Sequence, residues 1–217
     1  MRRLLDIDNP VMRLVIKLFD CMVLSVLWTV FSLPVITMGA SSTALYSAVY
    51  HHIRKDEGYL WKSFWNAFKE NFKRSTLAWL PMLAMILFLI YDVMALHVLI
   101  KNGNPFGRLF GIILVLLFVG LVWAVYLAAY CARFKGTVKE VLKYSFFLMM
   151  SHPLRAIGVM IAVVGSIALI LVVPGLAVML PALSFLVSSI LIEQVFAMHL
   201  RPEDQEDVNE GEENRDA

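Results

Sequence analysis

The sequence predicts an all-α, polytopic membrane helix bundle, with about six transmembrane helices arranged as three in-out-in hairpins. Of the 217 residues, 60% are hydrophobic and only 17% are charged, whereas soluble domains contain about 45–50% apolar and about 25% charged residues. The mean hydropathy is +0.74. A soluble core of this size cannot bury such an apolar excess, so lipid must cover much of the surface.

Hydrophobic segments make residues 1–201 a single membrane domain with six predicted spans. Four segments approach the length of about 20 apolar residues that crosses about 30 Å of hydrocarbon; they cover 76–100, 109–132, 154–173 and 176–199. The first hydrophobic block is broken at Ser32–Gly39, which predicts spans over 14–33 and 34–50. The segment 34–50 is short and rich in hydroxyl groups, so it either crosses fully or re-enters the membrane.

The distribution of lysine and arginine predicts the orientation. Bases are frequent before the first span and within 51–75 and 133–155, but sparse in 101–108 and absent from 173–175. The positive-inside rule then places both termini in the cytoplasm and the turn at Ser32–Gly39 outside. Residues 202–217 contain eight acidic residues and one base, which predicts a disordered acidic cytoplasmic tail.

Two amphipathic segments, 59–74 and 137–150, are predicted to be helices that lie in the membrane interface. The first places aromatic residues opposite lysines, the pattern of an interfacial helix. The second begins with a candidate capping box formed by Thr137 and Glu140. Because a span follows the basic aromatic segment 59–74 at once, we do not interpret it as a nucleic-acid site.

Three carboxylates fall within predicted spans, where ionisable groups are costly. Asp20 lies three residues after Lys17 on the same helical face, so these two are expected to form a structural pair. Glu193 lies at a similar inner depth, within reach of Lys17 or His199. We therefore interpret Lys17, Asp20, Glu193 and His199 as structural intramembrane polar groups.

Asp92 is the candidate ligand or proton site. It lies in the outer half of its span, where His97 and Lys101 are the nearest bases. In that setting a carboxylate could bind a cation, a proton or a sugar hydroxyl, or it could make a polar contact with another span. The chain has no phosphate loop, zinc-protease motif, nucleophile elbow or cysteine pair with metal spacing. No enzymatic activity, catalytic residue, metal or cofactor is predicted.

Two sequence blocks resemble the YesL family of bacterial multi-pass membrane proteins, which has no assigned function. The first block runs from Trp28 through Ser32-Leu33-Pro34-Val35-Ile36-Thr37-Met38-Gly39 to Tyr46, and the second covers 64–72. The signature positions are Trp28, Pro34, Thr37, Gly39, Ala44, Tyr46, Phe64, Phe68, Asn71 and Phe72. The resemblance implies a bacterial plasma-membrane protein whose genes often lie near carbohydrate-uptake transporters.

Two functions follow as hypotheses. The first is an accessory or assembly factor associated with carbohydrate ABC transport, with transporter permease subunits as partners within the lipid bilayer. The alternative is a small transporter or channel that uses Asp92 in a polar cavity. Small residues repeat every four positions at Ala40, Ala44 and Ala48, a spacing that suits close helix packing within the bundle or in a homo-oligomer.

Overall fold

The computed structural model describes residues 10–55, 59–101, 107 and 109–199. Every regular element within these ranges is helical, which confirms the all-α prediction. The α-helices are α1 (Pro10–Ser32), α2 (Met38–Ala48), α3 (Leu60–Lys101), α4 (Phe110–Arg133), α5 (Val138–Ser151), α6 (Pro153–Val172) and α7 (Leu180–His199). Three short helical turns join them: η2 (Val35–Thr37), the π-helical η3 (Val49–Arg54) and η5 (Pro174–Val178). The predicted acidic tail, 202–217, lies outside the described residues.

Four helices of the described chain are long and apolar enough to cross a membrane: α1, α3, α4 and α6. α7 is also apolar but has a shorter hydrophobic stretch, Leu180–Phe196. The predicted span 34–50 is occupied by η2, the 11-residue α2 and the start of η3. These apolar helices support a membrane protein, while the count of six crossings stays a prediction.

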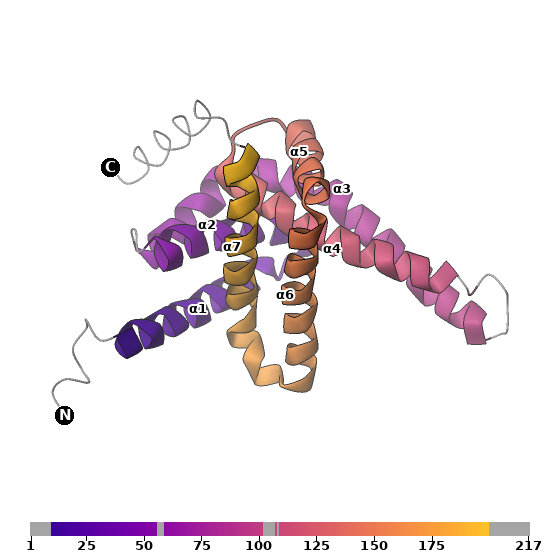
Figure 1. Cartoon of the computed structure of the whole chain (residues 1–217), viewed down its shortest axis with the longest axis horizontal. Coiled ribbons are helices and arrows are strands. Elements are labelled where there is room, and N and C mark those ends of the chain that lie inside the picture. The colour runs from indigo at the N-terminus through magenta and orange to yellow at the C-terminus, as the bar shows by residue number, and fades with distance from the viewer. Residues whose placement is uncertain (1–9, 56–58, 102–106, 108, 200–217) are drawn as a thin grey trace.

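Three helix pairs meet at the centre of the molecule (Figure 1). α1 and α2 form one hairpin, α6 and α7 run side by side as another, and α3 and α4 leave the centre together. We call the outer part of this last pair, residues 85–101 and 110–120, the α3–α4 arm. The main buried core lies where the pairs meet and includes residues from all seven α-helices.

α3 contains both the predicted interfacial helix at 59–74 and the predicted span at 76–100. The two segments form one continuous helix of 42 residues, about 63 Å long at 1.5 Å per residue. No proline or glycine lies between Arg74 and Thr76 to end the first segment, and Pro81 lies inside the helix without terminating it. The change in amphipathic character therefore occurs within one helix.

The start of α3 carries an aromatic stripe that packs mainly against protein. It consists of Trp61, Phe64, Trp65, Phe68 and Phe72. Phe31 of α1 has ring centroids 5.8 Å from Phe64, 5.6 Å from Trp65 and 5.1 Å from Phe68. Phe64 and Phe68 are buried, whereas Trp61 and Phe72 remain exposed. The stripe consequently joins α3 to the α1–α2 hairpin, and an interfacial position of this segment stays a prediction.

The α1–α2 turn is apolar outside and hydrogen-bonded inside. Leu33, Val35 and Ile36 are exposed. The hydroxyl of Thr37 donates to the carbonyls of Phe31 and Pro34, each at 2.8 Å. The indole of Trp79 in α3 donates to the Val35 carbonyl at 2.9 Å. The Pro34 and Val35 carbonyls also accept backbone bonds from Thr37 N and Met38 N. The turn is therefore well hydrogen-bonded, as non-helical backbone requires at membrane depth.

This turn lies far along α3 from the tip of the α3–α4 arm. Trp79, which contacts the turn, precedes Lys101 by 22 residues, or about 33 Å of helix. A hydrocarbon core is about 30 Å thick. The predicted outer turns at Ser32–Gly39 and 101–108 can therefore share one membrane surface only if this part of α3 lies nearly parallel to the membrane.

Gly39 lets α2 approach α3 closely. A Cβ atom added there would overlap Trp79 Cβ, and it would lie only 2.8 Å from Trp79 Cγ and 3.0 Å from the Ser75 carbonyl oxygen. The Ser75 oxygen belongs to the backbone of α3 and cannot rotate away. The glycine is thus required by the distance between the two helices rather than by its backbone angles.

We predict that Gly39→Ala lowers the free energy of unfolding by about 1–3 kcal/mol, the usual cost of overpacking. The matched control is Gly165→Ala in α6, where nothing lies within 4 Å of the added Cβ; it should leave stability unchanged or raise it by up to about 1 kcal/mol. Reversible unfolding in mixed detergent micelles, followed by tryptophan fluorescence, measures both. Equal stabilities of the two variants would contradict the close approach of α2 and α3.

Candidate functional site

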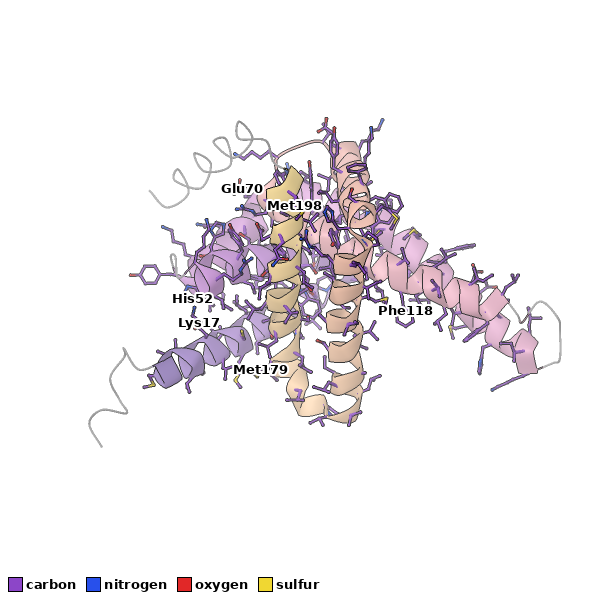
Figure 2. All side chains as sticks on the ribbon, viewed as in Figure 1. Lys17, His52, Glu70, Phe118, Met179 and Met198 are labelled. Atoms are coloured by element: carbon purple, nitrogen blue, oxygen red, sulfur yellow. The ribbon has the colours of Figure 1, made fainter. Side chains whose placement is uncertain are left out.

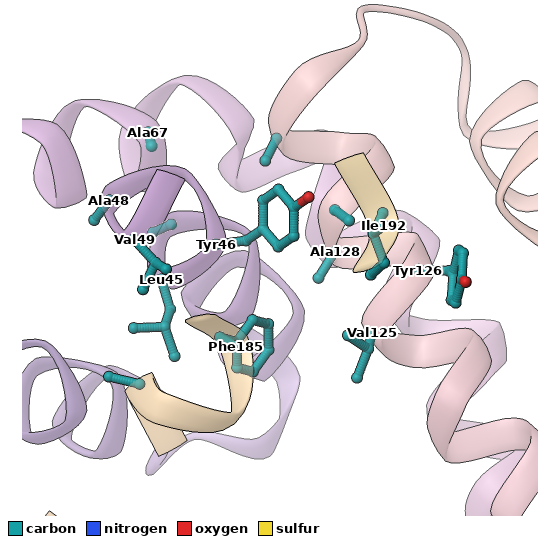
Figure 3. Packing of buried hydrophobic residues seen from close by; sticks show 14 of the residues in the cluster. Leu45, Tyr46, Ala48, Val49, Ala67, Val125, Tyr126, Ala128, Phe185 and Ile192 are labelled. Carbon is teal, nitrogen blue, oxygen red and sulfur yellow. The ribbon is translucent and has the colours of Figure 1, made fainter. Parts of the chain in front are cut away.

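A buried cluster of polar side chains joins α2, α4 and α7 at the centre of the molecule. The Tyr46 hydroxyl of α2 donates a hydrogen bond of 3.0 Å to Glu193 Oε1 of α7. Arg133 Nε, in the last turn of α4, lies 3.4 Å from the same oxygen. The Arg133 and Glu193 side chains are only 10% and 13% exposed. Figure 3 shows Tyr46 between Leu45 of its own helix and Ala128 and Ile192 of the neighbouring helices.

Tyr50 extends this cluster by one helical turn. The Arg133 guanidinium carbon lies 4.3 Å from the Tyr50 ring centroid, and Arg54 and Lys55 approach the same ring at 5.4 and 5.0 Å. Cations over an aromatic face are attracted to its π electrons. We define the Glu193 cluster as Tyr46, Tyr50, Arg133 and Glu193. Its carboxylate and its guanidinium carry opposite charges, so the pair is electrically balanced.

The π-helical turn η3 supplies most of the neighbouring polar contacts. Arg54 donates from Nη1 to the Ser189 carbonyl of α7 at 3.1 Å. His52 Nε2 lies 3.3 Å from Asp20 Oδ2 of α1, and Lys17 Nζ donates to the Ile53 carbonyl at 2.7 Å. Figure 2 shows Lys17 and His52 on these neighbouring elements. η3 is thus joined to α1 on one side and to α7 on the other.

A further basic residue links α3 to α4. Arg74 Nη2 donates to the Cys131 carbonyl of α4 and, at 2.7 Å, to Asn71 Oδ1 one turn earlier on α3. Asn71 in turn donates from Nδ2 to the Ala67 carbonyl at 3.1 Å. The side chains of Arg54, Arg74 and Arg133 therefore connect helices, although their positions in basic segments had suggested only cytoplasmic charges. Lys17, which was predicted to be a structural group, joins α1 to η3.

The predicted structural polar groups have partners that the sequence analysis only partly named. Glu193 contacts Tyr46 and Arg133, and its predicted contact with Lys17 or His199 stays a prediction. Asp20 is paired with His52. His199 is the last residue of α7, and its side chain lies outside the described part of the chain. Arg133 and Tyr50 were missed; the shared inner depth of Arg133 and Glu193 was the signal that could have found the pair.

The signature positions of the resemblance are mostly packing and capping residues. Trp28 Nε1 donates to Ser42 Oγ at 3.1 Å, and Ser41 Oγ donates to the Trp28 carbonyl at 3.1 Å. Pro34 and Thr37 form the α1–α2 turn, Gly39 touches Trp79, and Ala44 is fully buried. Phe64, Phe68 and Asn71 are buried in α3, and Phe72 is exposed. Of these positions, Tyr46 alone belongs to the Glu193 cluster.

Asp92 lies on the α3–α4 arm, away from the Glu193 cluster. It is half-buried, and its neighbours Phe88 and Tyr91 are 64% and 70% exposed. His97 faces Phe110 with ring centroids 6.2 Å apart, and a Cβ on Gly120 would lie 3.3 Å from Met85. Asp92 therefore lies level with the α4 residues between Phe110 and Gly120, which are apolar throughout. The arm does not bring further polar side chains of α4 to it.

Among the described residues, Asp92 forms no ion pair or side-chain hydrogen bond. An unpaired charge at the centre of a membrane helix costs about 2.5–3.5 kcal/mol on insertion scales. Across all the residues that the structure describes, no group of three or more His, Cys, Asp or Glu side chains could hold a metal ion. Cys21 and Cys131 are buried and are not joined to each other.

Residues 21–93 match the family described as "Protein of unknown function, DUF624". No curated protein and no solved structure matches the chain. The DUF624 match covers both blocks of the sequence resemblance, the α1–α2 turn and Asp92. It ends before α4 and α7, so Tyr46 lies inside the matched region while Arg133 and Glu193 lie outside it.

We predict that replacing Glu193 by leucine lowers the free energy of unfolding by about 3–5 kcal/mol, because the Arg133 guanidinium is then buried without its counter-charge. Tyr46→Phe should cost about 1.5–3 kcal/mol, the usual contribution of a hydrogen bond to a charged group. Lys62→Gln on the exposed face of α3 is the control and should change stability by less than about 0.5 kcal/mol. Reversible unfolding in mixed micelles measures all three. A change below 1 kcal/mol for Glu193→Leu would show that the pair does not hold the junction together.

Proposed function

We propose that this chain is an integral membrane accessory or assembly factor associated with carbohydrate ABC transport. The proposal is carried by the contacts of the interior polar groups: Glu193 contacts Tyr46 and Arg133, and these contacts join three helices. Because these side chains bind one another, they do not line a path for a solute. The outer faces of the arm and of α6 are broad, apolar and available to lipid or to another membrane protein. The carbohydrate part of the proposal depends on the resemblance to YesL sequences alone.

The alternative is a small transporter or channel with Asp92 in a polar cavity. One observation favours it: Asp92 has no side-chain partner among the described residues. Against it stands the location of Asp92 on an arm of two helices, opposite an apolar stretch of α4. A binding site for a sugar or a cation needs several converging polar groups. The accessory function also needs no enzymatic activity, and none is proposed.

We infer further that the protein lies in the bacterial plasma membrane, with both termini cytoplasmic and a re-entrant α1–α2 hairpin. The positive-inside pattern is the same for a hairpin that crosses fully and for one that re-enters, because both return to the cytoplasmic side. The exposed residues of the turn are apolar, and its carbonyls are satisfied by Thr37 and Trp79. Both features support a turn that stops short of the outer surface.

Cysteine labelling from outside the cell tests this topology. In a chain with Cys21 and Cys131 replaced by alanine, Ile36→Cys should resist a membrane-impermeant maleimide, whereas Gly175→Cys in η5 should react. Both positions are exposed in the fold, so a difference reports the membrane and not protein packing. Equal labelling at the two positions would instead establish a full crossing and the six-span topology.

Purification after gentle crosslinking in native membranes tests the accessory function. The chain should copurify with the permease subunits of a carbohydrate transporter, identified by mass spectrometry. A second experiment uses proteoliposomes. Wild type and Asp92→Asn should show the same low flux of sugars and protons as empty vesicles. Recovery of the chain without a permease would contradict the accessory function, and flux that Asp92→Asn abolishes would establish the alternative.

A further inference from the structure

Asp92 differs from the two other carboxylates that lie within predicted spans. Asp20 is 3.3 Å from His52, and Glu193 is bonded to Tyr46 and contacts Arg133. The fold therefore brings a donor or cation from another element to each of these two. Asp92 receives none from the described residues. Because a charge in an apolar environment needs a compensating group, a partner for Asp92 must come from elsewhere.

The surface around Asp92 has the form of a helix-packing face. Phe88, Tyr91, Ala95 and Val98 are exposed at spacings of three, four and three residues, so they form one stripe along α3. Asp92 lies four residues after Phe88 and three before Ala95, so it borders this stripe. A transmembrane helix that packs along this stripe would pass directly beside the carboxylate.

A second copy whose α3–α4 arm packs against this arm does not supply the missing cation. In a two-fold dimer with its axis along the membrane normal, residues at equal depth face each other. At the depth of Asp92 the arm offers only another Asp92 and the apolar residues of α4. His97 and Lys101 lie five and nine residues nearer the tip, about 7.5 and about 13.5 Å along the helix. Charge complementarity therefore points to a different protein.

We propose that the exposed stripe of the α3–α4 arm, with Asp92 at its edge, binds a transmembrane helix of a partner protein that presents a lysine, arginine or histidine to the carboxylate. The apolar stripe supplies packing, and the ion pair selects the partner and fixes its depth in the membrane. This inference rests on the accessory function proposed above and names the surface through which it is exerted. It leaves the Glu193 cluster as an internal contact.

Photo-crosslinking in native membranes tests the proposal. Benzoylphenylalanine replaces Phe88 on the stripe of the full-length chain, and in the matched control it replaces Ile161 on the exposed face of α6, where exposure is similar at 64% and 65%. After irradiation, the crosslinked peptides are identified by mass spectrometry. Position 88 should give an adduct with an apolar segment of another protein that contains a basic residue. Position 161 should give no adduct with that segment.

Variants of Asp92 then establish whether the carboxylate is needed. Asp92→Asn should lower the yield of the adduct at position 88 by at least about tenfold, since truncating one member of a buried charge pair weakens binding strongly. Asp92→Glu should retain most of the adduct. An adduct with a second copy, an adduct with lipid alone, a partner segment without a base, or a yield unchanged in Asp92→Asn would each overturn the proposal.

The stability of the purified chain separates docking from a structural role. In detergent, without a partner, Asp92→Leu should leave the melting temperature unchanged or raise it, because an unpaired charge is removed. A clear fall in melting temperature would show that Asp92 holds the fold together and would overturn the proposal. If the crosslinked partner is a membrane protein other than a transporter subunit, the docking surface stands and the proposed function in carbohydrate transport fails.

Discussion

The buried carboxylate of Glu193 is the constraint on which the arrangement of the helices depends. A carboxylate that is removed from water must be paired, and its partners come from two other helices, Tyr46 of α2 and Arg133 of α4. Their contacts determine how α2 and α4 lie against α7. Tyr50, one turn after Tyr46, then lies beneath the same guanidinium. The core where the helix pairs meet is therefore organised around a charge, although most of its side chains are apolar.

The same constraint separates the polar groups of the chain into two kinds. Asp20 and Glu193 are compensated within the fold, so they serve its stability. Asp92 lies on the arm, opposite apolar residues of α4, and the described chain does not compensate it. An accessory protein of this kind would use internal ion pairs to hold its helices together and the half-buried carboxylate of Asp92 to select a partner. That division relates the fold to the proposed function without any catalytic group.

The hydrophobic pattern predicted where the helices lie. It did not predict that α3 is continuous, and it did not predict which side chains pair with the buried charged residues. The apolar runs identify helices, but nothing in the amphipathic change near Arg74 says whether the backbone stops, and α3 continues through it. Counting bases cannot separate a crossing hairpin from a re-entrant one. The Tyr46–Glu193 bond joins residues 147 positions apart, so its existence depends on the packing of α2 against α7. Arg133 was assigned to a loop because its role appears only once α4 and α7 are placed together.

The coupling between Arg133 and Glu193 tests most directly whether a buried charge pair organises the junction. A double-mutant cycle with Arg133→Met, Glu193→Leu and the double variant measures it from the free energies of unfolding in mixed micelles. We expect a coupling energy of about 2–3 kcal/mol, with the apolar double variant more stable than either single one. Additive effects, with a coupling energy below about 0.5 kcal/mol, would contradict the account.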